Sequence, residues 1–110
     1  MNLRTGEIVL IEVQFHQTLG AKVRPAVVVL DSGDADFVAA PITSRVRASE
    51  FDVTLGDWRG AGLNVPSVVR IDKVAVLAKA DIRRLAGMIT GDDLASIRKA
   101  LCRAFCPNHH

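Results

Sequence analysis

The sequence predicts a mainly β fold that ends in one α-helix. Short runs of β-branched and other apolar residues, each bounded by glycine, proline, aspartate or serine, recur along most of the chain, which is typical of several short strands. The last stretch instead repeats its apolar residues every three to four positions, as an amphipathic helix does. Because 110 residues suit one domain, we expect residues 1–110 to form a twisted sheet or half-open barrel with the helix packed on it.

The first half of the chain is expected to supply three strands. Residues 6–14 are rich in β-branched residues and begin with glycine, so they predict a strand, and residues 15–23 predict a loop. The continuous apolar run 26–30 predicts a strand buried on both faces. A cluster of turn residues at 31–36 then leads into an antiparallel return over 37–42, so these two strands form a hairpin.

The second half is expected to add shorter strands. Residues 51–55 alternate apolar and polar side chains, as in a half-exposed strand, and the glycine-punctuated stretch 56–62 predicts a loop. Residues 67–71 predict another strand, which 74–77 continue after a bend. The mixed spacing of residues 79–85 favours a helical turn.

The C-terminal helix has the clearest local signals. Thr90 is placed to cap it, and Asp92 and Asp93 suit the positive end of the helix dipole. We therefore expect the helix to lie against the sheet through one stripe of apolar side chains: Leu94, Ile97, Leu101 and Phe105.

Composition narrows the class of protein. A hydrophobic content of 49% with 24% charged residues excludes disorder, and no stretch approaches the ~20 apolar residues that span a bilayer. The first residues lead directly into a strand pattern without the segments of a secretion signal, so we expect a soluble, cytoplasmic protein without a membrane partner. The net charge is only +2, but ten of the 14 basic residues are arginine, which favours a local anion-binding patch.

Neither a metal site nor another cofactor site is expected. Cys102 and Cys106 are four residues apart on the predicted helix, and His109 and His110 follow them. No second pair of ligands completes a metal set, so we expect one or both thiols to pack as small hydrophobic groups. The sequence also has no glycine-rich phosphate loop.

An arginine and a hydroxyl pair are the strongest candidates for anion binding. Pro25 pushes the preceding residue out of the helical region, so Arg24 should be held extended at the mouth of a strand, where its guanidinium can grip phosphate oxygens. Thr43 and Ser44 follow the next predicted strand and add hydroxyls. Two other readings stay open: Arg24 pairs with an acidic neighbour, and the hydroxyls only bond nearby backbone in a turn.

The order of four motifs resembles the MazF/PemK family of toxin endoribonucleases over nearly the whole chain. These motifs are Gly6-Glu7-Ile8, Arg24-Pro25, Pro41-Ile42-Thr43-Ser44 and Ser67-Val68-Val69-Arg70-Ile71-Asp72. The resemblance implies an SH3-like small barrel of the MazF/Kid/CcdB toxin type that forms a homodimer and cuts single-stranded RNA without a metal or other cofactor. It also implies a cognate antitoxin, whose acidic C-terminal tail with apolar anchors lies in the RNA groove, and a toxin–antitoxin complex that binds DNA.

The resemblance assigns the catalytic arginine to Arg24 and the catalytic hydroxyl to Thr43. Attack of a 2′-hydroxyl on the neighbouring phosphorus gives a 2′,3′-cyclic phosphate and a 5′-hydroxyl end, and a guanidinium with a hydroxyl donor stabilises the charge that develops. Arginine has a pKa above ~12 and is a poor base at neutral pH. The general base therefore stays open between Asp72, His16 and a water molecule.

Five further residues are expected to bind RNA. The resemblance places Arg70 and Asp72 at the RNA site and Ser44 beside the catalytic hydroxyl. Arg45 in the flanking loop would position a phosphate, and His16 lies in the loop where some family members use a histidine. Two plainer readings stay open: an intrastrand salt bridge between Arg70 and Asp72, and an exposed bystander role for His16.

A second class of function is also compatible with the sequence. A protein of the same fold without catalysis, such as a gyrase poison or a module that only holds an antitoxin, would bind its partner and leave RNA intact. The presence of Arg24 together with Thr43 favours the endoribonuclease, because a binding module does not need that pair.

Overall fold

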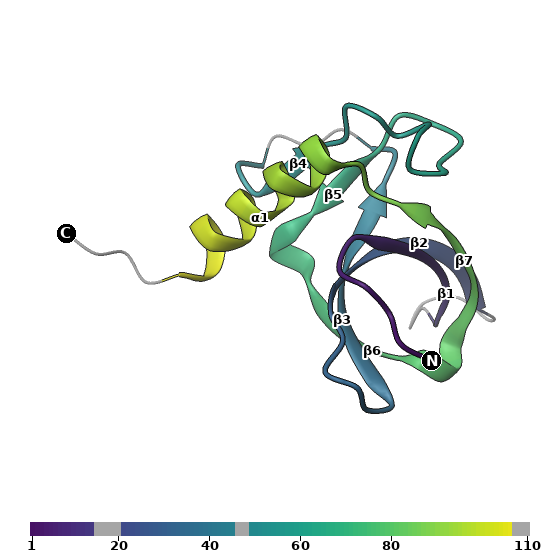
Figure 1. The fold of residues 1–110 in the computed structure, drawn as a ribbon. Coiled ribbons are helices and arrows are strands. Elements are labelled where there is room, and N and C mark those ends of the chain that lie inside the picture. The colour runs from purple at the N-terminus through teal and green to yellow at the C-terminus, as the bar shows by residue number, and fades with distance from the viewer. Residues whose placement is uncertain (15–20, 46–48, 107–110) are drawn as a thin grey trace.

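The computed structural model describes residues 1–14, 21–45 and 49–106. Its strands form an antiparallel sheet that curls around a barrel-like core, and one α-helix lies outside it (Figure 1). The strands are β1 (Glu7–Gln14), β2 (Ala21–Leu30), β3 (Asp36–Thr43), β4 (Asp52–Thr54), β5 (Val68–Arg70), β6 (Ala75–Ala78) and β7 (Ile82–Met88). The helices are the 3₁₀ turns η1 (Ile71–Lys73) and η2 (Lys79–Asp81) and the α-helix α1 (Gly91–Phe105). The predicted fold class, mainly β with a C-terminal helix, is confirmed.

Strand β3 connects the two parts of the sheet. Within the described chain the order is β4-β5-β3-β2-β1-β7, and β6 pairs with β3 off this path. The first half of β3 pairs with β6, from Asp36 opposite Ala78, and its last two residues pair with β5. The predicted hairpin of β2 and β3 is also present. The end of β3 is therefore the point where the barrel meets the small β4–β5 extension.

Alternation along the strands divides the core into two clusters. One cluster lies under α1 and includes Ile8, Val27, Ala40, Ile42 and Val69, together with Ile97 and Ala100 of the helix. The other cluster fills the barrel and consists of Leu3, Val9, Ile11, Ala26, Val28, Phe37 and Ala39. Both faces are thus buried along most of β3 but only over residues 26–28 of β2. The prediction that the apolar run 26–30 is buried on both faces is wrong at its end, because Val29 is half-buried and Leu30 is exposed.

Strand β2 begins earlier than predicted. It starts at Ala21, so Arg24 and Pro25 lie inside the strand and not at its mouth, and the predicted loop over residues 15–23 is wrong for its last three residues. Pairing with β3 ends at Ala26 opposite Pro41. Pro25 therefore lies where β2 is paired with β1 but no longer with β3, an edge position that tolerates a missing N–H.

Strand β7 replaces the helical turn predicted for residues 79–85. Only Lys79–Asp81 form a 3₁₀ turn, and Ile82–Met88 pair with β1. The register shifts twice along this pair, so apolar and charged residues do not alternate cleanly in the sequence. Pairing with a strand far away in the chain decided the structure here, against the local pattern. The bend predicted before residues 74–77 is the 3₁₀ turn η1.

The helix α1 follows its signals at the start and departs from them at the end. Thr90 occupies the N-cap position, but its side chain makes no capping hydrogen bond. Ile97 is buried and Leu94 and Leu101 are half-buried, whereas Phe105 is exposed, so the prediction that Phe105 faces the sheet is wrong. The C-terminal part of α1 runs out past the sheet (Figure 1). No helix in the described ranges combines the length and apolar character that crossing a bilayer requires.

The loop between β4 and β5 is fixed from two sides. The carboxylate of Asp93, in the first turn of α1, accepts hydrogen bonds from the backbone N–H groups of Gly56 and Asp57, both at 2.9 Å. On the other side the loop touches β7, where a Cβ at Gly87 would collide with the carbonyl oxygen of Ala61. These contacts fix the position of the loop that joins β4 to β5.

Candidate functional site

The face of the sheet turned away from α1 gathers the polar residues of the candidate site. Ile42 on β3 lies opposite Val69 on β5, and both pack in the core beneath α1. Side chains alternate along a strand, so the next pair, Thr43 opposite Val68, points to the other face. Arg70, two residues beyond Val68, points the same way and is a diagonal neighbour of Thr43. This face therefore holds a hydroxyl beside a guanidinium.

Arg24 belongs to the same face, one strand away. The register of β2 and β3 places Ala26 opposite Pro41. Arg24 comes two residues before Ala26 and Thr43 two residues after Pro41, so both side chains follow the alternation to the face of that pair. Arg24 is exposed. The structure thus places Arg24 and Thr43 at the same end of the β2–β3 pair.

The hydroxyl of Thr43 is held by its own turn. The backbone N–H of Arg45 donates a hydrogen bond to Thr43 Oγ1 at 3.1 Å, which is the local turn contact that the sequence left open. A hydroxyl can accept and donate at once, so this bond orients the oxygen and leaves its hydrogen for another acceptor. Ser44 and Arg45 are exposed immediately after Thr43. The turn therefore adds polar groups to the rim of the same face.

The ion-pair partner of Arg70 is Asp52, not Asp72. Asp52 lies directly opposite Arg70 in the β4–β5 pair, with Arg70 Nε 4.0 Å from Asp52 Oδ1. The chain leaves the strand at Ile71 to form η1, so Asp72 is exposed in a 3₁₀ turn and does not share a strand face with Arg70. The intrastrand salt bridge considered from the sequence is therefore wrong. His16 lies outside the described residues.

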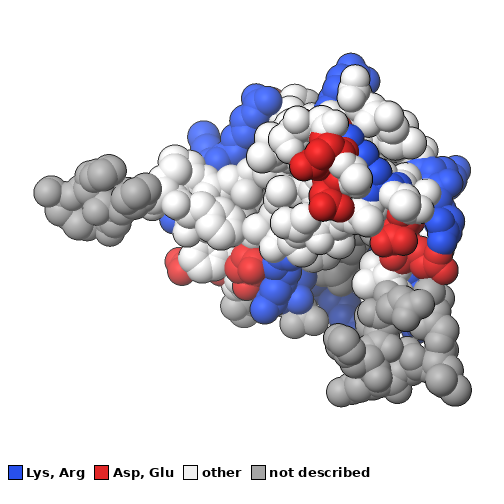
Figure 2. All heavy atoms as spheres, turned by 90° about the horizontal axis from the view of Figure 1, so that it is seen from below, with Lys and Arg blue, Asp and Glu red and all other residues white. Residues whose placement is uncertain are grey.

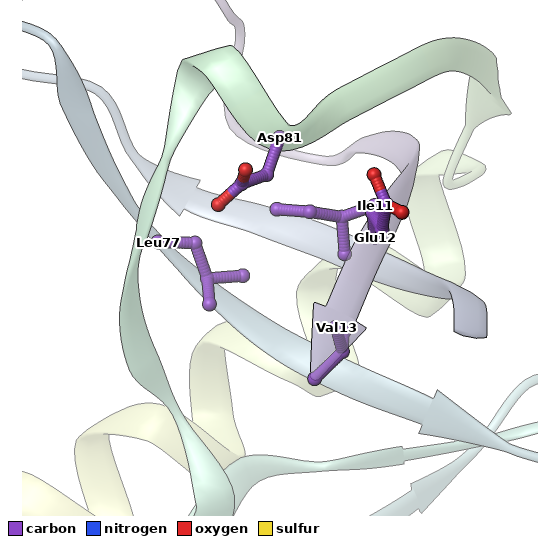
Figure 3. Close-up of a pocket in the computed structure, with 5 residues that line it drawn as sticks. All are labelled: Ile11, Glu12, Val13, Leu77 and Asp81. Carbon is purple, nitrogen blue, oxygen red and sulfur yellow. The ribbon is translucent and has the colours of Figure 1, made fainter. Parts of the chain in front are cut away.

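A shallow hollow lies one strand beyond Arg24. Ile11 on β1 is directly opposite Arg24, and it forms part of the wall of a hollow of about 330 Å³. Figure 3 shows the side chains that line it from β1, β6 and η2: Ile11, Glu12, Val13, Leu77 and Asp81. Its walls are largely apolar, and one of its two carboxylates, that of Glu12, pairs with Arg83.

Comparison of the sequence with known protein families identifies the family of this chain. Residues 4–105 match the family described as PemK-like, MazF-like toxin of type II toxin-antitoxin system. The chain belongs to this family. The resemblance indicated by the order of the four motifs is thereby confirmed. No curated protein matches the chain significantly.

Solved structures of MazF proteins have the same fold as this PemK-like, MazF-like chain. The Mycobacterium tuberculosis toxin MazF-mt6 aligns with a TM-score of 0.76 at 23% identity, over 94% of this chain and 99% of that one. A mycobacterial endoribonuclease in complex with its cognate antitoxin aligns with a TM-score of 0.79 at 22% identity, over 98% and 100%. The MazE–MazF structure (Form-III) from Deinococcus radiodurans aligns with a TM-score of 0.76 at 26% identity, over 94% and 96%.

The charge of this PemK-like, MazF-like chain is mixed at its surface. Figure 2 shows basic and acidic groups interspersed on one side of the molecule, without a continuous basic surface. The mixture agrees with the small net charge of +2.

Two carboxylates of this family member have roles that the sequence did not reveal. Asp52 stands across from Arg70, and Asp93 binds the β4–β5 loop in addition to lying in the first turn of α1. Asp93 showed only a helix-dipole signal, and Asp52 only an alternating strand pattern. The register of β4 with β5 would have been needed to pair Asp52 with Arg70.

The thiols near the end of α1 are not buried. Cys102 and Cys106 are both exposed, with their Sγ atoms 3.0 Å apart, so the expectation that they pack as small hydrophobic groups is wrong. A hydrogen bond with the Cys102 thiol raises the pKa of Cys106. No set of three or more His, Cys, Asp or Glu side chains in the described part of the chain could hold a metal ion, and His109 and His110 lie outside that part.

Proposed function

We propose that this toxin is an endoribonuclease that cleaves single-stranded RNA with some sequence preference and without a metal ion. The observation that supports this most is the common face of Arg24, Thr43 and Arg70, which come from three strands of the sheet. Two guanidinium groups and an oriented hydroxyl near one another suit the oxygens of one phosphodiester. A module that only holds an antitoxin has no need of the hydroxyl.

The proposed reaction removes one proton from the attacking oxygen and adds one proton to the leaving oxygen. The 2′-oxygen of the nucleotide attacks its own 3′-phosphorus and gives up its proton to a base, which we propose is Asp72, His16 or a water molecule. The bond from phosphorus to the 5′-oxygen of the next nucleotide breaks, and that oxygen takes up a proton. The products are a 2′,3′-cyclic phosphate and a 5′-hydroxyl end.

The residues have separate tasks in this proposal. Arg24 neutralises the charge that grows on the non-bridging oxygens, and the Thr43 hydroxyl donates to one of them. Arg70 holds the same or the adjacent phosphate. Ser44 and Arg45, on the rim, position the backbone of the RNA. Loss of one donor to the developing charge is expected to lower the rate by roughly 10²–10³.

We propose that the toxin acts in the cytoplasm as a homodimer and is inhibited by a cognate antitoxin. The Deinococcus radiodurans relative, at 26% identity, was solved as a MazE–MazF complex. An antitoxin with an acidic C-terminal tail and apolar anchors would compete with RNA for the arginine face. By the same analogy, the complex of the two proteins would bind DNA.

The test is incubation of the purified protein with a long single-stranded RNA in EDTA, followed by analysis of the new ends. We expect fragments with 2′,3′-cyclic phosphate and 5′-hydroxyl ends, and no cleavage of the matching DNA, which lacks the attacking hydroxyl. Intact RNA at micromolar concentrations of folded protein would instead support a non-catalytic binding protein, such as a gyrase poison.

A further inference from the structure

We infer that Asp52 is a positioning residue for Arg70, which it holds so that the guanidinium presents its outer edge to an RNA phosphate. This inference rests on the proposed function, because it gives Arg70 its task. It assigns to Asp52 a role that neither the sequence motifs nor the family resemblance indicated.

The two side chains form a buried pair on the face of the site. Asp52 and Arg70 lie directly opposite each other in the β4–β5 register, so their side chains share a face. The Asp52 side chain is only 5% exposed and that of Arg70 19%. The backbone around them is fixed, because Ile71 N–H donates to the carbonyl of Phe51 at 3.2 Å. The pair therefore has a defined place in the sheet.

The pair is not closed by a hydrogen bond. Arg70 Nε lies 4.0 Å from Asp52 Oδ1, and both oxygens of Asp52 and this Nε are buried without a hydrogen-bond partner. Leaving a buried charged group without hydrogen bonds is costly, and apolar residues of similar size often stabilise a protein as well or better. Stability alone therefore gives no reason for a carboxylate at this position.

The orientation of the guanidinium gives a reason. Asp52 lies beside the Nε atom of Arg70, at the inner end of the planar group. The two terminal nitrogens are not among the buried unpartnered atoms, and no hydrogen bond within the described residues engages them. A guanidinium binds phosphate with two parallel N–H groups. With Asp52 beside its inner end, Arg70 offers its terminal pair to the face that it shares with Thr43.

This arrangement predicts opposite effects on binding and on catalysis. Asp52→Asn removes a negative charge from the RNA-binding face, so ground-state attraction for a polyanion does not fall. The substitution also removes the group that orients Arg70, and a misplaced catalytic contact can cost up to about a hundredfold in rate. We therefore expect kcat to fall roughly ten- to hundredfold while KM for RNA stays the same or decreases.

The experiment is a double-mutant cycle of Asp52→Asn and Arg70→Gln on single-stranded RNA cleavage, with activity expressed per folded molecule. The matched control is Asp36→Asn, which removes the same charge from an exposed residue at the other end of β3. We expect Asp52→Asn to lower kcat in the native background and to cause no further loss when Arg70 is already Gln. Asp36→Asn should leave kcat unchanged in both backgrounds.

The outcomes separate the two proposals. If the unmodified protein and Asp36→Asn leave RNA intact, the proposed function fails. If they cleave RNA and Asp52→Asn keeps the native kcat, or if its loss adds fully to that of Arg70→Gln, the positioning role is wrong. Should Asp52→Asn not fold, Asp52→Glu replaces it in the cycle: the carboxylate moves by one methylene, and a loss of kcat that disappears in Arg70→Gln is again expected.

Discussion

The Asp31–Lys79 pair and the Asp52–Arg70 pair each join an acid to a base, but only the first is completed by hydrogen bonds. Lys79 Nζ lies 2.9 Å from the Asp31 carboxylate, whereas Arg70 Nε lies 4.0 Å from that of Asp52. Backbone N–H groups also donate to Asp31, while both oxygens of Asp52 are buried without a partner. The completed pair lies past the end of β2, away from Arg24 near the start of that strand, whereas the incomplete pair is part of the arginine face.

The first pair has a structural task that explains each contact. Asp31 accepts hydrogen bonds from the backbone N–H groups of Leu3 and Gly33, both at 2.8 Å, and Lys79 Nζ also donates to the carbonyl of Met1 at 3.0 Å. These bonds tie the N-terminal segment to the end of β2 and to η2. Hydrogen bonds thus give the Asp31 carboxylate a structural role, whereas the Asp52 carboxylate has none that would do the same.

The largest expected effect comes from a substitution on the face that holds the incomplete Asp52–Arg70 pair. Arg24→Ala removes a guanidinium from the face that holds Arg70 and Thr43, so cleavage of single-stranded RNA should fall by roughly 10²–10³. Initial rates on a defined RNA measure this change. Arg98→Ala, on an exposed position of α1, is the matched control and should keep the native rate. A variant at Arg24 that cleaves as fast as this control contradicts the assignment.

The second largest effect comes from replacing Asp52 and Arg70 together, which should change activity and stability in different ways. Asp52→Leu with Arg70→Met should lower cleavage severely, yet leave the free energy of unfolding unchanged or raise it by about 1–4 kcal/mol, because a costly buried pair is replaced by apolar contact. The corresponding change Asp31→Leu with Lys79→Met should lower the free energy of unfolding, since backbone N–H groups lose their acceptor. Urea unfolding measures both. Destabilisation of similar size in the two double variants would mean that the pairs do the same work.

A third carboxylate sharpens the comparison, because Asp93 resembles Asp31 in accepting two backbone hydrogen bonds. Asp93→Ala leaves the N–H groups of Gly56 and Asp57 without that acceptor and should lower the free energy of unfolding by about 1–3 kcal/mol. Cleavage per folded molecule should not change. Denaturant titration and initial rates test the two statements, and a loss of kcat without loss of stability would place Asp93 with Asp52 instead.

The smallest effect concerns pH and Asp31. The backbone hydrogen bond from Leu3, and then the contact with Lys79, lower the pKa of Asp31 from 3.8 to about 2. A carboxylate whose folded pKa is lowered stabilises the fold above its unfolded pKa and loses that contribution as the pH falls. The difference in unfolding midpoint between the native protein and Asp31→Asn should therefore be constant above pH 5 or so and shrink towards about pH 2. A pH-independent difference would contradict the bonding of Asp31.

Local sequence patterns were sufficient for much of the fold. The β-branched run of β1, the apolar run of β2 and the helical repeat of α1 each carry their signal within a few neighbouring residues. Strand β7 carries no such signal, because its pairing with β1 shifts register twice. Phe105 fits the helical repeat and still faces solvent, since the helix extends beyond the sheet that would cover it.

The candidate site likewise has residues that the sequence predicted and residues that it did not. Arg24 and Thr43 were predicted from their own residue pattern and Arg70 from the family resemblance, and the strand register places all three on one face. Asp52 was not found, because its relation to Arg70 depends on how β4 pairs with β5 across a long loop. Asp72 was placed on a strand with Arg70, but the 3₁₀ turn η1 intervenes.

In the proposed function, Arg24 and Arg70 bind the backbone of one RNA on one face of the sheet. The most direct measurement follows the NMR signals of the arginine side-chain Nε–H groups during titration with a single-stranded RNA whose 2′-hydroxyls are replaced by fluorine, so that it cannot be cleaved. We expect the signals of Arg24 and Arg70 to shift together with one dissociation constant, while that of Arg98 on α1 stays in place. Shifts with separate midpoints, or a shift of Arg98 alone, would contradict it.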